Sequence, residues 1–266
     1  MADRVLLSLD QYNLEEGVAL AEEYQLGVEV MAFAFPEVLD GNWEAEVKRH
    51  RALLSRLNGP ITMHGPFMDM VSGSPDPRIQ QVCMQRYKQA IDIAPMIGAN
   101  LVNFHANYIG ALHNVTYRTG WHNRAVKFWR QIAEYAREYD VMLVLENMWE
   151  FDPTILANLL QEVNHPNLLA CLDIGHTYIF SDDRYTLQDW LETLRPWLIH
   201  THMNNNNGVL DEHYAFDWEN GVLDYNIVLE HVRALPYPPN IVLEMYTVED
   251  MRNSLGYFEV GEPTTS

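Results

Sequence analysis

The chain has 266 residues, of which 48% are hydrophobic and 20% charged, as in globular proteins with a sizeable core. Its 17 Lys and Arg against 37 Asp and Glu give a formal net charge of −20, which argues against nucleic acid as the main partner because phosphate backbones are bound by clustered Lys and Arg. No apolar run reaches the roughly 18 residues of a membrane span, and no signal peptide is visible. The two cysteines, Cys83 and Cys171, are too few for a disulfide framework. We therefore expect a cytoplasmic protein.

Short apolar runs alternate with amphipathic segments along the whole chain. The runs typical of buried strands are residues 5–9, 27–31, 61–64, 101–105, 142–146, 168–173, 198–202 and 241–245. The segments with helical periodicity are residues 14–24, 43–58, 77–97, 119–139, 153–163, 187–194 and 225–234. This alternation is typical of parallel βαβ units, and eight strands in this length predict one (β/α)8 TIM barrel domain over residues 1–266. A doubly wound open sheet is the alternative.

Six consecutive strands of this scheme, the third to the eighth, end on a side chain that can bind metal. These residues are His64, His105, Glu146, Asp173, His202 and Glu244. His176 follows the sixth strand, and Asp211 and His213 follow the seventh. In a (β/α)8 barrel all strands end at the same mouth, where active sites are built. The sequence therefore predicts one ring of these side chains.

A single His or Glu at a strand end is more often structural than functional, but six in succession favour a shared role. Crowded carboxylates raise one another's pKa and destabilise the fold unless a cation lies among them. Oxygen and imidazole ligands suit Zn²⁺, Mn²⁺, Co²⁺ or Fe²⁺, so we predict a divalent-metal site. Cys171 and His200, each two residues before a strand end, are interpreted as core packing, with a supporting role at the site as the alternative for His200.

At these positions the chain resembles the xylose-isomerase-like TIM barrel superfamily. The superfamily contains sugar and sugar phosphate isomerases and epimerases, and the endonuclease IV type of abasic-site DNA repair enzyme. The matching motifs are Met63-His64-Gly65-Pro66, Phe104-His105, Leu145-Glu146-Asn147, Asp173-Ile174-Gly175-His176, His200-Thr201-His202, Asp211-Glu212-His213 and Leu243-Glu244. They cover most of the chain in the order expected for the superfamily.

In the ketose-epimerase branch the resemblance implies one metal ion. Its ligands would be Glu146, Asp173, His202 and Glu244. Glu146 and Glu244 would be the catalytic pair that moves a proton at the carbon next to a carbonyl, while the metal stabilises the enediolate. His64, His105 and His176 would bind the substrate. This branch usually has an arginine soon after the seventh strand, whereas residues 203–207 here are Met-Asn-Asn-Asn-Asn, which leaves the ketose open.

In the endonuclease branch the resemblance implies three zinc ions. His64, His105 and Glu146 would bind the first, and Glu146 would bridge to a second held by Asp173, His202 and Glu244. The additional ligands His176, Asp211 and His213 would bind the third. All of these positions are present, but residues 32–36 and 203–213 contain no Lys or Arg, so the basic surface that DNA binding needs is missing.

We therefore expect a metal-dependent isomerase or epimerase of a small ketose or polyol-derived ketone, with one to three Mn²⁺, Zn²⁺ or Co²⁺ ions per chain. A zinc-dependent abasic-site nuclease or phosphoesterase is the first alternative. A barrel that binds metal or a small molecule without turnover is the second. The expected partner is a small sugar-like substrate rather than nucleic acid or a membrane, and a homodimer is a reasonable oligomeric state.

Overall fold

Eight short parallel strands close into a barrel in the computed structural model, which describes residues 3–260. The strands are β1 (Arg4–Leu9), β2 (Gly27–Val30), β3 (Ile61–His64), β4 (Leu101–His105), β5 (Met142–Glu146), β6 (Leu168–Asp173), β7 (Leu198–Met203) and β8 (Asn240–Leu243). Each strand pairs with the next in chain order, and β1 pairs with β8 to complete the ring. The predicted (β/α)8 barrel is confirmed, and the open sheet is excluded.

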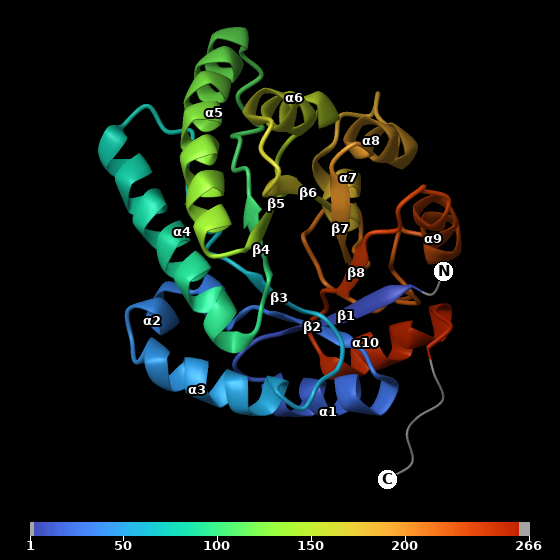
Figure 1. The fold of residues 1–266 in the computed structure, drawn as a ribbon. Coiled ribbons are helices and arrows are strands. Elements are labelled where there is room, and N and C mark those ends of the chain that lie inside the picture. Colours follow the sequence, from blue (N-terminus) through green and yellow to red (C-terminus); the bar gives the residue numbers. More distant parts are fainter. Residues whose placement is uncertain (1–2, 261–266) are drawn as a thin grey trace.

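Helices surround the ring of strands, as Figure 1 shows. They are α1 (Leu14–Tyr24), α2 (Pro36–Leu39), α3 (Trp43–Leu54), α4 (Pro77–Ile97), α5 (Val115–Glu138), α6 (Pro153–Val163), α7 (Ile174–Phe180), α8 (Leu187–Leu194), α9 (Tyr225–Arg233) and α10 (Val248–Ser254). The short 3₁₀ turns are Ala32–Ala34 and Leu255–Tyr257. Within residues 3–260, no helix combines the length and apolarity that crossing a membrane requires.

The core lies on both sides of the barrel wall. Every residue of β2 and β4 is buried, because inward side chains fill the barrel and outward ones pack against helices. Trp121 and Trp129 of α5 and Trp190 of α8 are among the largest fully buried side chains. The helices thus contribute an apolar layer outside the barrel wall, while the inward-facing side chains of the strands fill its interior.

Some helices and strands have other boundaries than the sequence predicts. The helix expected from residue 119 begins at Val115, because the Asn114 side chain accepts the Tyr117 backbone N–H at 2.9 Å and caps the first turn. The short helices α2, α7 and α10 were not predicted, since they have too few residues to show a helical period. The eighth strand, expected over 241–245, ends at Leu243, so Glu244 lies just beyond it.

A buried histidine in α3 couples stability to pH. His50 Nδ1 donates to the Glu46 carbonyl at 2.8 Å, its Nε2 has no hydrogen-bond partner among the residues described, and burial lowers its pKa. As the pH falls below about 6.5, the unfolded chain takes up a proton there before the folded protein does. This protonation therefore lowers the free energy of unfolding by up to about 1.4 kcal/mol per pH unit.

A His50→Leu variant is expected to lack this part of the acid sensitivity. Urea unfolding of both proteins at several pH values between about 7 and about 5 measures the two slopes. The slope should be shallower in the variant. Equal slopes would show that His50 titrates alike in the folded and unfolded states.

Candidate metal centre

The carboxyl ends of β3 to β8, with α7 and the loop after β7, bring all nine predicted ligands to the mouth of the barrel in three adjoining groups. The first cluster is His64, His105 and Glu146; the second cluster is Glu146, Asp173, His202 and Glu244; the third cluster is His176, Asp211 and His213. The ligand atoms of the first and third clusters each lie within 4.8 Å of one another, as do those of His64, His202 and Glu244. The nine residues therefore form one continuous centre, with Glu146 shared by two clusters.

The first cluster is built on the adjacent ends of β3, β4 and β5. Glu146 Oε2 lies 3.5 Å from His64 Nε2 and 3.3 Å from His105 Nε2. His64 Nδ1 donates to the Gly65 carbonyl at 2.8 Å, so its Nε2 is the nitrogen that faces Glu146. The Phe67 ring packs against both imidazoles, with centroid distances of 5.1 and 5.0 Å, and forms an apolar wall beside them.

The second cluster places two glutamates around one imidazole. His202 Nδ1 lies 3.1 Å from Glu244 Oε2 and 3.4 Å from Glu146 Oε2. The side chains of His202, Glu146 and Asp173 are almost completely buried, whereas that of Glu244 keeps 12% of its surface exposed. Glu244 is therefore the carboxylate of this cluster that is most open to a molecule entering the mouth.

Asp173 also organises the turn that follows β6. Its Oδ1 accepts the His176 backbone N–H at 2.6 Å and caps α7, and its Oδ2 lies 3.4 Å from Asn204 Nδ2. A Cβ atom at Gly175 would lie 2.5 Å from Asn204 Oδ1 and 3.2 Å from Asp173 Oδ1. Only glycine leaves room for this close approach, which explains the Asp-Ile-Gly-His spacing.

The third cluster joins α7 to the loop after β7. Asp211 Oδ1 lies 3.4 Å from His176 Nε2 and 3.4 Å from His213 Nε2. The opposite nitrogens donate to backbone carbonyls, His176 Nδ1 to Asn147 at 2.8 Å and His213 Nδ1 to Glu244 at 2.9 Å. Both imidazoles are therefore fixed with Nε2 toward the carboxylate.

These separations fit metal coordination. Across the three clusters, the facing nitrogen and oxygen atoms described above lie 3.1 to 3.5 Å apart, and all of these distances exceed the ~2.7–2.9 Å of a charge-assisted hydrogen bond. Two ligand atoms each about 2.1 Å from one tetrahedral zinc ion lie about 3.4 Å apart. Carbonyl acceptors on the far nitrogens of His64, His176 and His213 leave the near nitrogens as metal donors. The donor set and these distances thus suit a divalent cation at the first and third clusters, and between His202, Glu146 and Glu244 of the second cluster.

The charges of the centre balance one another through ion pairs. Burial would raise the pKa of Glu244, but the His202 imidazole outweighs it and holds that pKa at about 2. Burial raises the pKa of Asp173 to about 6. Burial opposes protonation of His213, yet Asp211 raises its pKa to about 9. A bound divalent cation would take the place of such protons, because metal ligands must be deprotonated.

The loop after β7 is held by asparagines rather than by an arginine. Asn205 Nδ2 donates to the Phe216 carbonyl at 2.8 Å and the Leu223 carbonyl at 3.2 Å, and its Oδ1 accepts the Leu223 N–H at 3.1 Å. Asn206 Nδ2 donates to the Gly175 carbonyl at 3.3 Å. Asn204, Asn205 and Asn206 are all buried. The run that departs from the epimerase motif is therefore a scaffold that carries the third cluster.

We expect Asn205→Leu to loosen this loop. The variant leaves buried backbone groups of Phe216 and Leu223 without partners, at a cost of about 1–3 kcal/mol for each group. Chemical denaturation of the metal-free protein should show the lower stability, and proteolysis should cut within residues 205–223 faster than in the wild type. Unchanged stability and unchanged cleavage would contradict this role of Asn205.

Three polar residues that support the centre were missed by sequence reasoning. Glu29 on β2 is fully buried and lies 2.9 Å from His200 Nε2. Asn103 donates to Glu146 Oε2, and Asn147 Oδ1 accepts the backbone N–H at the end of β6 at 2.9 Å. An acidic residue within the apolar run 27–31, or an Asn beside a strand-end ligand, was the available signal.

Cys171 lies in the barrel wall next to the centre. It packs with Leu101 and Val144, in agreement with its interpretation as a core residue. Its sulfur also lies within 4.8 Å of ligand atoms of Glu146 and His202. Burial raises the pKa of the Cys171 thiol well above its usual value. Cys171 is therefore a protonated thiol in this arrangement, below the oxygen and imidazole groups of the mouth.

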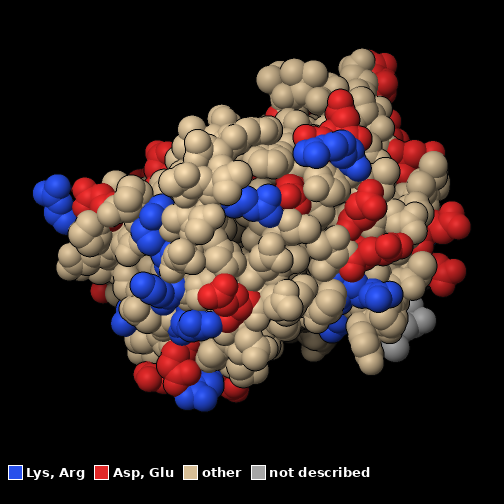
Figure 2. Space-filling view, turned by 90° about the horizontal axis from the view of Figure 1, so that it is seen from above, with Lys and Arg blue, Asp and Glu red and all other residues tan. Residues whose placement is uncertain are grey.

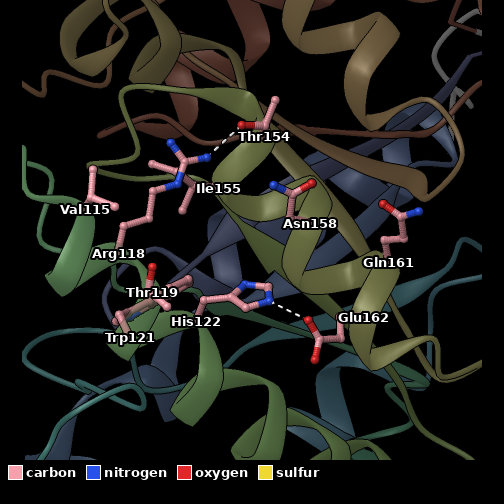
Figure 3. Close-up of a pocket in the computed structure, with 10 residues that line it drawn as sticks. All are labelled: Val115, Arg118, Thr119, Trp121, His122, Thr154, Ile155, Asn158, Gln161 and Glu162. Carbon is pink, nitrogen blue, oxygen red and sulfur yellow. Dashed lines mark hydrogen bonds and ion pairs between the residues drawn. The ribbon is translucent and has the colours of Figure 1, made fainter.

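A separate pocket of about 410 Å³ lies between α5 and α6, outside the barrel. Figure 3 shows two pairs of its polar side chains directed at each other, Arg118 at Thr154 and His122 at Glu162. The distances are 2.7 Å for Arg118 to Thr154 Oγ1 and 2.7 Å for His122 to Glu162. The charged side chain Arg118 and the His122–Glu162 pair of this pocket thus already have partners.

Comparisons with known proteins agree with this architecture. A family model described as xylose isomerase-like TIM barrel matches residues 18–259. An uncharacterised protein of Methanocaldococcus jannaschii is 26% identical over 210 residues, 77% of this chain and 70% of that protein. A protein from Thermus thermophilus, soaked with ZnCl₂, superposes with a TM-score of 0.77 at 26% identity over 96% of both chains. A D-tagatose 3-epimerase-like protein has a TM-score of 0.77 at 23% identity, over 95% of this chain and 94% of that one, and shares the fold.

Proposed function

The chain belongs to the xylose isomerase-like TIM barrel family, and we propose that it is a divalent-metal-dependent isomerase or epimerase of a small ketose or polyol-derived ketone. The observation that carries this proposal is the second cluster, in which Glu146 and Glu244 approach the same His202 nitrogen. Isomerases and epimerases of this kind need two groups that accept and return a proton next to a carbonyl. The D-tagatose 3-epimerase-like neighbour supports the same class.

The two glutamates have the protonation state that proton removal requires. The imidazoles around Glu146 outweigh its burial and hold its pKa well below the usual range, and Glu244 is similarly ionised. In the proposed reaction one carboxylate accepts the proton from the substrate carbon. In an isomerisation the carboxylic acid so formed returns that proton to the neighbouring carbon, whereas in an epimerisation the other glutamate must first take up a proton when the substrate binds and then deliver it to the same carbon from the opposite face. A divalent cation at the second cluster would polarise the substrate's carbonyl and hydroxyl oxygens. Asp173 and His202 would hold that cation.

His64, His105 and His176 line the same mouth and would bind substrate hydroxyl groups or hold further cations. Their near-complete burial, with the rings of His64 and His176 held by backbone carbonyls, would orient the substrate over the glutamates. The number of bound ions, one or three, thus depends on whether the first and third clusters also hold a cation. The expected ions are Mn²⁺, Zn²⁺ or Co²⁺.

The test combines metal analysis with a proton-transfer assay. Purified protein is analysed for metal identity and stoichiometry, then incubated in D₂O with a panel of ketoses and keto-polyols and followed by NMR. We expect solvent deuterium at the carbon next to the carbonyl, loss of this exchange with a chelator, and recovery on adding metal back. Metal-loaded protein that exchanges no substrate proton across the panel would contradict the proposal.

A zinc-dependent phosphoesterase or abasic-site nuclease is the second candidate, because the first and third clusters are complete. Three occupied clusters would suit hydrolysis, in which metal ions activate water and stabilise the leaving oxygen. On the face shown in Figure 2, however, Lys and Arg are interspersed with Asp and Glu. The discriminating assay is nicking of an abasic-site duplex at low salt. Robust nicking that is lost in His105→Ala would favour this second function.

A further inference from the structure

A carboxylate lies beneath the metal centre, inside the barrel. Glu29 occupies the middle of β2, is fully buried, and pairs in register with Thr62 of β3. Thr62 Oγ1 donates to Glu29 Oε2 at 2.7 Å, and His200 Nε2 lies 2.9 Å from the same oxygen. The other oxygen, Oε1, lies 2.9 Å from His202 Nε2. One buried acid thus contacts the back of a proposed metal ligand.

We propose that Glu29 is a positioning residue, which holds His202 with its Nε2–H toward Glu29 and its Nδ1 toward Glu146 and Glu244. The inference rests on the proposed metal-dependent function and identifies what orients one of its ligands. Glu29 does not touch the mouth itself. It acts through His202 alone.

The proton positions follow from the partners. Asn240 Nδ2 lies 3.2 Å from His200 Nδ1, and an amide N–H can only donate, so His200 carries its hydrogen on Nε2 and donates it to Glu29. An ionised carboxylate can only accept. His202 Nε2 lies 2.9 Å from Glu29 Oε1, and among the residues described neither atom has a hydrogen-bond partner, the contact between them not being aligned as one. Because an ionised carboxylate oxygen this close repels a nitrogen lone pair, we infer that His202 Nε2 also carries its hydrogen. This leaves Nδ1 to bind a cation, at 3.1 Å from Glu244 Oε2.

The same three residues, Glu29, His200 and His202, could themselves surround an ion, since their ligand atoms lie within 4.8 Å of one another. The hydrogen bonds argue against this arrangement. Glu29 Oε2 already accepts from Thr62 and His200, and an ion there would require both imidazole Nε2 atoms to be deprotonated. Protonated Nε2 atoms on His200 and His202 would therefore mean that Glu29 accepts their hydrogens, whereas unprotonated Nε2 atoms would mean that the three residues surround an ion.

NMR of ¹⁵N-histidine-labelled protein loaded with Zn²⁺ shows directly which ring nitrogens of His200 and His202 carry a hydrogen. In the wild type we expect His202 to show a slowly exchanging Nε2–H and an unprotonated Nδ1. A His202 with Nδ1–H and unprotonated Nε2 would overturn the proposal, as would unprotonated Nε2 atoms on both His200 and His202. This reading needs no variant, so it decides the matter even where a substitution prevents folding.

Glu29→Gln tests the consequence. In the place of Oε2, the amide N–H₂ would oppose both the N–H of His200 and the hydroxyl that Thr62 donates. It is therefore expected in the place of Oε1, where it opposes the N–H of His202 and removes the fixed orientation of that ring. We expect Zn²⁺ affinity, measured by competition with a chelating dye, to fall about 10–100-fold, with faster exchange of the His202 ring N–H. Wild-type affinity and exchange in this variant would refute the positioning role.

Thr201→Val is the matched control. Thr201 lies between the two histidines on β7, is fully buried, and donates its hydroxyl to the Asn240 carbonyl at 2.9 Å instead of to Glu29. The Thr201→Val substitution removes a buried hydrogen bond on the same strand as the two histidines. An equal loss of Zn²⁺ affinity in this variant would therefore assign the effect of Glu29→Gln to general destabilisation. Wild-type protein that binds no divalent ion would refute the proposed function. The role of Glu29 would still be decided in that case, by comparing the His202 Nε2–H and its exchange rate between metal-free wild type and metal-free Glu29→Gln.

Discussion

Replacing Glu244 by Gln is expected to lower turnover by at least about 10²–10⁴-fold, the usual contribution of a general acid–base group. Glu244 is the more exposed of the two paired glutamates and lies 3.1 Å from His202 Nδ1. A glutamine has nearly the same shape, but its amide accepts no proton from a substrate carbon and is a weak metal ligand. Deuterium exchange into the substrate, measured with the ketose that the panel identifies, should fall together with kcat.

Glu212→Gln provides the control for that experiment. Glu212 lies in the same loop as Asp211 and His213, outside the three clusters, so its replacement makes the same change of charge near the mouth. We expect it to retain turnover and metal content. A fully active Glu244→Gln protein would disprove the two-glutamate mechanism, and metal analysis of each variant separates loss of the base from loss of the ion.

The strand-end ligands could be predicted because two simple regularities meet there. Strands of four to six residues are visible as apolar runs, and parallel strands in a barrel deliver their last residues to one mouth. His105 and Glu146 show this directly, since they are register partners on β4 and β5. The position of each candidate ligand at the mouth therefore followed from where its strand stops.

Glu29 could not be predicted in the same way. It lies inside a strand, and whether such a side chain faces the barrel interior or the helices depends on the stagger between neighbouring strands, which the sequence does not display. Its partners, Thr62 and His200, are 33 and 171 residues away. A charged residue among apolar ones signals a special environment, but its partners are known only once the barrel is closed.

The residues of the third cluster could be assigned to the mouth because they follow the sixth and seventh strands, but their grouping as one cluster came from the family resemblance, since two of them lie in an irregular loop. Asp211 and His213 have no strand to place them. Their positions depend on side chain to backbone bonds such as Asn205 to Phe216 and to Leu223. A run of asparagines looks like exposed loop sequence, since the side-chain amide suits turns, yet here it is buried. Such polar scaffolding carries no periodic signal.

Replacing Glu146 by Gln should have the broadest effect of any single change in the centre. Its Oε2 faces His64, His105 and His202 at 3.5, 3.3 and 3.4 Å, and its Oε1 lies 3.5 Å from His176. A glutamine can keep the bond from Asn103, but it removes the charge shared by the first and second clusters. We expect metal affinity at both clusters to fall more than about 100-fold, since a ligand is lost outright, and turnover to disappear.

The metal-free Glu146→Gln protein should also be less stable. The low pKa of Glu146 means that the folded protein favours its charged form, so its stabilisation is present at neutral pH and is lost as the pH falls into the acid range. Removing one partner of a buried ion pair costs about 3–5 kcal/mol. Denaturation at neutral pH should reveal this difference, and at acid pH the variant and the wild type should converge.

Glu150→Gln is the matched control for Glu146→Gln. Glu150 is equally buried, but its carboxylate accepts backbone N–H groups, from Met148 at 2.7 Å and from Tyr108 at 3.1 Å. It should lose stability without losing metal, because its oxygens face no imidazole cluster. Equal metal retention in both variants would mean that Glu146 is a structural acid, and the second cluster would then lack the bridging carboxylate on which the proposed chemistry depends.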